Sequence, residues 1–117
     1  MNADFVVKNG ELVKCADANI SVFNKAFFFD FAVYSNIVVR AGKMFLPLLE
    51  VEKLFDSAKA ICLIHPFEKR QVVDWAYRLV EKNSLKDALI RLLLIGGEDG
   101  SKPQLWLFPV GLTFYPG

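Results

Sequence analysis

The sequence predicts an α+β domain in which a mostly antiparallel sheet is covered on one face by two helices, forming a two-layer sandwich. Three observations predict this fold. Short strand-like runs occur toward both ends of the chain, amphipathic helical spacing is confined to the middle, and turn-forming pairs separate neighbouring runs. Strands grouped with strands and helices grouped with helices are typical of α+β folds, not of alternating α/β folds.

The first part of the chain predicts two hairpins. Asn9-Gly10 lies between two short apolar runs, and this pair accepts the positive φ angles that a tight hairpin turn requires. Ala41-Gly42 follows a run rich in β-branched residues and is expected to form the second turn. The predicted strands are the two arms of 5–13, then 33–40 and 43–45.

The middle of the chain predicts two helices. From Pro47 onward, apolar residues recur every three or four positions, which is typical of an amphipathic helix over 47–62 with proline in its first turn. His65-Pro66 interrupts this pattern, and the same spacing then predicts a second helix over 67–82. Two more strand candidates complete the order, 88–95 and 104–113.

Length and composition limit the possible classes of function. The 117 residues suit a single domain over 1–117, and the 54% of hydrophobic residues exclude intrinsic disorder. The net charge of +1 argues against a dedicated nucleic-acid or membrane-surface binder, which would need a strong basic excess. The sequence has no export signal and no apolar run approaching the roughly 20 residues that span a membrane, so we expect a cytoplasmic protein.

The residues do not predict a self-contained catalytic centre. His65 is the only histidine, and its place before a proline favours an ordinary loop residue over a partner for a nucleophile. Cys15 and Cys62 are expected to be reduced and buried, and no His, Cys or carboxylate cluster has metal-ligand spacing. The acidic pair Glu50/Glu52 is expected on the solvated side of the first helix.

An aromatic block lies between the two predicted hairpins. Phe27, Phe28 and Phe29 are consecutive, so they cannot all face one side of a strand or one stripe of a helix. Some of these side chains must therefore contact a second surface. A run of this kind is more often core or interface than a ligand cage. The predicted interface residues are Phe27, Phe28, Phe29 and Phe31.

Seven short motifs, each weak by itself, occur in a fixed order along the chain. They are Asn9-Gly-Glu-Leu-Val13, Ala18-Asn-Ile-Ser-Val22, Val33-Tyr34, Gly42-Lys-Met-Phe45, Leu54-Phe-Asp-Ser-Ala-Lys59, Leu79-Val-Glu-Lys-Asn83 and Leu85-Lys-Asp-Ala-Leu-Ile-Arg91. Together they resemble the N-terminal small domain of the class IV pyridoxal-phosphate-dependent aminotransferases. That family includes branched-chain and D-amino acid aminotransferases and aminodeoxychorismate lyase, and the resemblance covers roughly residues 6–97.

The resemblance implies pyridoxal phosphate as the cofactor and a small domain that is followed by a larger one, with the cofactor between them. The lysine that forms the Schiff base lies in the larger domain, so no catalytic residue is assigned to this chain. That lysine holds the cofactor and shuttles a proton, and transamination should be lost or crippled without it. The reaction implied is amino-group transfer between a small apolar amino acid and a 2-oxo acid.

Three positions match site residues of the family. Lys53 matches a basic residue, usually arginine, that contacts the cofactor phosphate; lysine offers a point charge without the bidentate fork. Tyr34 and Arg91 match residues that line the substrate pocket. The alternatives are that Lys53 is a solvated helix lysine near Glu50 and that Arg91 is an ordinary surface residue of a strand.

Two departures from the family pattern leave the activity open. Asp30-Phe31-Ala32 stands where the family commonly has a Gly-Asp-Gly turn, and Ser35 stands where it usually has glutamate. One hypothesis is the small domain of an aminotransferase-like protein, with a large domain supplied elsewhere. The other is a non-catalytic interaction domain that dimerises and keeps the fold. In both cases we expect a homo-oligomer or a separate large domain as partner, with no nucleic acid, membrane or metal.

Overall fold

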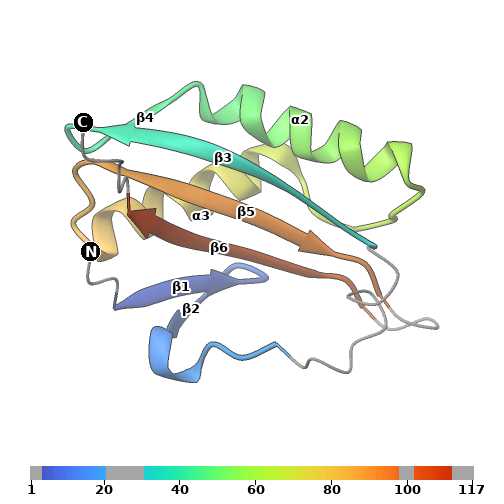
Figure 1. Cartoon of the computed structure of the whole chain (residues 1–117), viewed down its shortest axis with the longest axis horizontal. Coiled ribbons are helices and arrows are strands. Elements are labelled where there is room, and N and C mark those ends of the chain that lie inside the picture. The colour runs from blue at the N-terminus through green and yellow to red at the C-terminus, as the bar shows by residue number, and fades with distance from the viewer. Residues whose placement is uncertain (1–3, 21–30, 98–101, 112–117) are drawn as a thin grey trace, which may run out of the picture.

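The structure is a computed structural model, and it describes residues 4–20, 31–97 and 102–111. They form one six-stranded sheet in the order β2-β1-β6-β5-β3-β4, in which every neighbouring pair is antiparallel, with two helices behind it (Figure 1). The predicted α+β class is confirmed. The elements are β1 (Phe5–Lys8), β2 (Glu11–Lys14), the 3-10 turn η1 (Cys15–Asp17), β3 (Ala32–Arg40), β4 (Lys43–Phe45), α2 (Pro47–Ala60), α3 (Lys69–Lys82), β5 (Ala88–Ile95) and β6 (Gln104–Gly111).

The core lies between the helices and one face of the sheet. Residues of β5 alternate, so that Ala88, Ile90, Leu92 and Leu94 are fully buried toward the helices while the residues between them face the other way. From α2, the side chains Val51, Leu54 and Ala58 complete this core, and from α3, Val72, Ala76 and Leu79 do so. Burial of one stripe of each helix against the sheet is what the three-to-four residue spacing predicts. No helix within these described ranges is long and apolar enough to cross a membrane.

The first hairpin turn is locked against α3 and β6. Gly10 has φ +90°, and a Cβ there would lie 2.7 Å from the ring of Trp75, so both the backbone angle and the packing require glycine. The Asn9 amide donates to the Leu105 carbonyl at 2.8 Å, and the Asn9 side-chain oxygen accepts from the Leu105 amide at 2.7 Å. The turn therefore joins β1 to β6, two strands far apart in sequence.

Both helices end in the same capping geometry, built without glycine. At the end of α2, Cys62 takes φ 59°, its amide donates to Lys59, and the Leu63 amide donates to Ala58. Ser84 takes φ 50° after α3, with equivalent bonds. These bonds are those of a Schellman motif, which satisfies the last carbonyls of a helix. The predicted first helix, 47–62, therefore ends two residues earlier, at Ala60.

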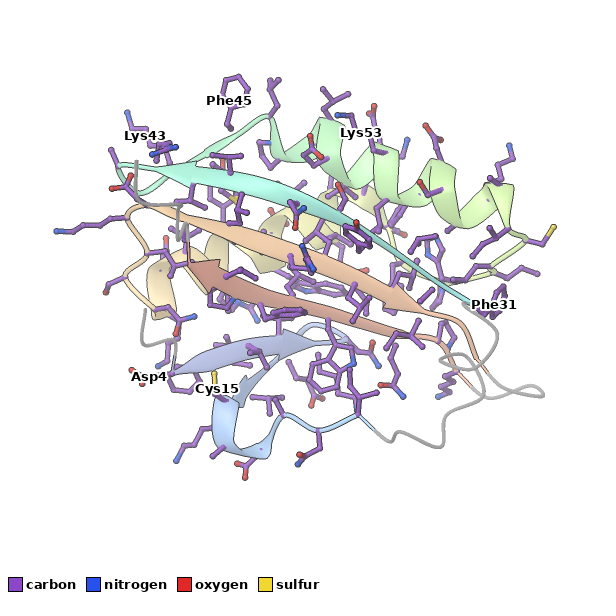
Figure 2. All side chains as sticks on the ribbon, viewed as in Figure 1. Asp4, Cys15, Phe31, Lys43, Phe45 and Lys53 are labelled. Carbon is purple, nitrogen blue, oxygen red and sulfur yellow. The ribbon has the colours of Figure 1, made fainter. Side chains whose placement is uncertain are left out.

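The expectation that both cysteines are buried is wrong. Cys15 begins η1 and Cys62 occupies the left-handed cap of α2, and both side chains are exposed. Cysteine is on average a buried residue type, but here two surface positions in the fold decide its exposure. Figure 2 shows Cys15 at the end of the sheet that also carries Asp4.

The side chain of Asn83 clamps β1 onto the end of α3. Its oxygen accepts from the Asp4 and Phe5 amides at 3.1 and 3.0 Å, and its nitrogen donates to the Phe5 carbonyl at 2.9 Å. One half-buried side chain thus satisfies three backbone groups at the start of the sheet.

Replacing Asn83 should destabilise the fold through this clamp. Asn83→Ala leaves three backbone groups without their partner, and we expect a loss of about 1–3 kcal/mol in the free energy of unfolding. Urea denaturation measures this loss. Asn19→Ala is the matched control, since Asn19 is exposed and makes a 3.5 Å bond to Asp17. Equal effects of the two substitutions would contradict the clamp.

His65 links the two helices through a row of aromatic rings. Its ring centroid lies 4.3 Å from that of Phe55 and 5.7 Å from that of Phe67, and Phe67 in turn packs edge-on against Trp75. Its Nδ1 accepts a hydrogen bond from the Phe67 amide at 3.1 Å. Burial lowers the pKa of His65 below its ordinary value of 6.5.

This burial makes stability depend on pH. Because the folded pKa of His65 is below 6.5, the unfolded chain binds more protons just below that pH, and the free energy of unfolding should fall as the pH drops below 6.5. His65→Phe should remove this contribution. His65 is the only histidine, so the contribution of its titration is the difference in the free energy of unfolding between the unmodified chain and His65→Phe, measured by urea denaturation over pH 5–8. Parallel profiles would contradict the prediction.

Candidate functional site

The face of the sheet that the helices leave uncovered carries two of the three predicted site residues. Tyr34 alternates with Ser35 and Ile37, which face the helices, and Arg91 lies between Ile90 and Leu92 of the core. Alternation therefore directs Tyr34 and Arg91 to the opposite, open face. They come from β3 and β5, which are adjacent strands.

Three side chains on this open face form one polar group. The Arg91 Nε donates to the side-chain oxygen of Asn36 at 3.2 Å, and the Arg91 guanidinium lies 4.8 Å from the centroid of the Tyr34 ring. Arg91 is half-buried, whereas 62% of the Tyr34 surface is exposed. Among the described residues, Arg91 makes no ion pair with a carboxylate. Its remaining donors are therefore suited to an anion brought by a ligand.

Apolar residues surround this polar group. Leu93 lies opposite Tyr34 in the sheet, and Phe108 lies opposite Arg91. Both also line an apolar hollow of about 320 Å³ on the same face. The segment after β2 closes the far side of the hollow, whose other lining residues are Val6, Cys15, Ala18, Ile20, Trp106 and Pro109. The open face thus combines an arginine with an apolar floor.

Beside this group, β3 forms the edge of the sheet. β4 pairs only with Val38–Arg40, so the β3 residues Tyr34–Asn36 have a strand neighbour on one side only, β5, within the described chain. α2 packs along β3 more than along β5, and Figure 1 shows it beyond this edge. α2 is therefore the helix that lies next to this edge of the sheet.

Lys53 lies on α2 and is held by an internal network. Its ammonium is 3.2 Å from one oxygen of Glu50, and the other oxygen of Glu50 accepts from the buried Ser35 hydroxyl at 2.8 Å. The Lys53 side chain is 60% exposed and that of Glu50 only 23%. The expectation that Glu50 is on the solvated side of the helix is thus wrong, because its carboxylate turns inward to the serine on β3. Figure 2 shows Lys53 on α2, beyond β3.

The structure therefore brings Tyr34 and Arg91 together and places Lys53 across the sheet from them. Of the predicted interface residues, Phe27, Phe28 and Phe29 lie outside the described residues. Phe31 is half-buried and packs on two groups of buried residues, the core under the helices and a smaller group of Val6, Ile95 and Trp106. Its ring fills the space beside Gly96, where a Cβ would overlap the ring. Its interface role stays a prediction.

Sequence reasoning found neither the role of Asn36 nor the bond between Ser35 and Glu50. No sequence pattern predicts the contact of Asn36 with Arg91, because nothing in the sequence shows that β5 lies beside β3. The bond between Ser35 and Glu50 joins a strand to a helix 15 positions away, which is equally invisible. The pair Glu50 and Lys53 did carry a signal, since residues three apart on a helix are neighbours. Within 4–20, 31–97 and 102–111, no three His, Cys, Asp or Glu side chains are placed to hold a metal ion.

Comparison with known proteins gives a consistent set of relatives. A protein of Methanocaldococcus jannaschii, provisionally named a branched-chain-amino-acid aminotransferase, is 33% identical over 89 residues, which are 76% of this chain and 31% of the relative. The D-alanine aminotransferase of Listeria monocytogenes is 26% identical over 92 residues, 79% of this chain and 32% of the relative. This chain is a partial-length homologue of the class IV branched-chain and D-amino acid aminotransferases. It spans about a third of the length of these curated relatives, and no family model matches it.

Solved aminotransferases share the fold of this aminotransferase homologue. The Escherichia coli branched-chain amino acid aminotransferase superposes with a TM-score of 0.89 at 23% identity, over 99% of this chain and 42% of that one. The branched-chain aminotransferase of the archaeon Thermoproteus uzoniensis, solved with norvaline, gives a TM-score of 0.85 at 20% identity, over 96% and 42%. A further branched-chain enzyme, solved with pyridoxamine 5'-phosphate, gives a TM-score of 0.87 at 19% identity, over 100% and 42%. At these identities the likeness concerns the fold, and it extends over the whole sheet and both helices.

Removing the hydroxyl of Ser35 should loosen α2 from the sheet. Ser35→Ala leaves one oxygen of the half-buried Glu50 without its donor, and we expect a loss of about 1–2 kcal/mol in the free energy of unfolding. Ser57→Ala on the exposed side of α2 is the matched control and should change little. Urea denaturation compares the two variants, and an unaffected Ser35→Ala would show that the bond contributes nothing to stability.

Proposed function

We propose that this chain is the small domain, spanning 1–117, of an aminotransferase-like protein, equivalent to the N-terminal domain of its relatives. In this proposal it supplies one wall of a pyridoxal-phosphate site, and a lysine-bearing large domain completes that site. The observation that carries the proposal is the free edge of β3, beside which Tyr34 and Arg91 lie on the open face and Lys53 lies on α2. The homology to branched-chain and D-amino acid aminotransferases supports it.

The donors at this edge fit a phosphorylated aromatic cofactor. The Lys53 ammonium has three N–H groups and, among the described residues, makes one bond, to Glu50, so donors remain for a phosphate oxygen. Glu50 is fixed by Ser35 and keeps the ammonium positioned on α2. When bound, the cofactor supplies an electron sink that stabilises negative charge at the α-carbon of an amino acid.

The open face supports a substrate class for this proposal. Arg91 offers charged donors to a carboxylate, and the Asn36 bond fixes the orientation of the guanidinium. Leu93 and Phe108 offer apolar surface to a side chain. This arrangement supports transfer of an amino group between a small apolar amino acid and a 2-oxo acid, with Tyr34 and Arg91 contacting the substrate and Lys53 the cofactor phosphate.

A second candidate function is a non-catalytic interaction domain that keeps this fold. The ion pair between Lys53 and Glu50 favours it, because a lysine already paired within its own helix has a structural role without any cofactor. Under either function we propose a cytoplasmic protein that forms a homodimer or binds a separate large domain. Phe27, Phe28, Phe29 and Phe31 remain the proposed contact residues for that assembly.

The phosphate contact separates the two functions. Pyridoxamine 5'-phosphate is the probe, because it lacks the aldehyde that would condense with surface lysines. We expect it to bind the chain and to shift the NMR signals of α2 and of the Arg91 side chain, with Lys53→Ala weakening binding about tenfold, the loss of one charge-assisted bond. Pyridoxamine without the phosphate should bind equally weakly to both proteins.

The control is another lysine on the same helix. Lys59 is exposed near the end of α2, and Lys59→Ala should leave the affinity for pyridoxamine 5'-phosphate unchanged. If Lys53→Ala and Lys59→Ala have the same effect, or if the probe shifts no signal of α2, the cofactor role of Lys53 is wrong and the interaction domain is favoured.

A further inference from the structure

A second surface lies on the helical layer, on the side of the sheet away from Arg91. A shallow hollow of about 320 Å³ lies between α2 and α3. We call its lining the helix patch. It consists of Leu48 from α2 and of Arg70, Val73, Asp74 and Tyr77 from α3.

The helix patch is apolar in its middle and carries one charge of each sign. Leu48 is 40% exposed and Tyr77 53%, so two large apolar side chains of the helix patch face solvent. The four residues of α3 are spaced at i, i+3, i+4 and i+7, and they form one stripe along the outer side of the helix.

The two charges of the helix patch are unpaired within the described chain. Neither Arg70 nor Asp74 takes part in an ion pair among residues 4–20, 31–97 and 102–111. They are four residues apart, but with the basic residue first, which is the weaker of the two orders for a pair within a helix. Each charge therefore remains available to a partner.

We propose that the helix patch binds the same patch of a second copy of this chain, with the two α3 helices antiparallel. A two-fold axis near Val73 reverses the stripe, so that Arg70 of one copy faces the region of Asp74 and Tyr77 of the other. Each interface then contains two Arg70–Asp74 pairs, and each guanidinium can also stack on a Tyr77 ring. Because Arg70 and Asp74 have opposite charges and exchange places across the two-fold axis, the charges of one helix patch are complementary to those of a second copy.

This self-association leaves the proposed cofactor site free. The helix patch lies on the outer side of the helices, whereas Tyr34 and Arg91 lie on the opposite face of the sheet. A large domain can therefore cover the open face while two copies pair through α3. The pairing also differs from an assembly through Phe27–Phe29, so the two can be tested separately.

Charge reversal tests the pairing directly. In sedimentation velocity, the unmodified chain should approach twice its monomer mass of 13.2 kDa as its concentration rises. Arg70→Asp and Asp74→Arg should each sediment as monomers, because each puts like charges opposite one another. An equimolar mixture of the two variants should regain the dimer mass, since the two acidic side chains of one variant then face the two basic side chains of the other.

The mixture is the decisive measurement. If a variant were monomeric because it misfolds or packs poorly, adding the other variant would not restore the dimer. Circular dichroism checks that both variants remain folded. Asp56→Arg and Lys59→Asp make the same charge changes on α2 outside the helix patch, and they should leave the dimer intact. The proposal is overturned if the unmodified chain stays monomeric, if the single variants remain dimeric, or if mixing them restores nothing.

Discussion

The alternation of side chains along β3 and β5 is the constraint on which the rest of this structure depends. Every second residue of these strands is buried under α2 and α3, and the residues between them face the other way. Because the core fixes which row is buried, it also fixes that Tyr34, Asn36 and Arg91 share the open face. A slip of one residue in the pairing would exchange the two rows and place an arginine in the core.

The edge of the sheet at β3 is the place where residues of the open face and residues of α2 come near each other. The two faces of a sheet are normally separated by the sheet itself, but β4 is short, and no other strand of the described residues pairs with β3 on that side at Tyr34–Asn36. Glu50 reaches in from α2 to Ser35 at this place, and it holds Lys53 nearby. A short edge strand therefore lets one helix and the opposite face of the sheet contribute to the same proposed site.

The local elements could be predicted because their signals are local. The turn pair Asn9-Gly10 and the apolar spacing after Pro47 depend on neighbouring residues, and the structure confirms the hairpin and the helix. The end of the first helix was less accurate, since Cys62 adopts a left-handed cap that glycine usually signals, whereas the second helix ends at Lys82 as predicted. The exposure of the cysteines was predicted wrongly for a similar reason: residue type gives an average, and position in the fold decides the individual case.

By itself, the sequence determined the α+β class and the order of the elements, because periodicity and turn signals are properties of the chain. The resemblance added Tyr34, Lys53 and Arg91 as proposed site residues. Only the tertiary structure decided their arrangement. It placed β5 beside β3, which gave Arg91 its contacts with Asn36 and Tyr34. It also put Lys53 on the other side of the sheet, bound to Glu50. Strand order and packing are set by contacts between distant residues, which no local pattern encodes.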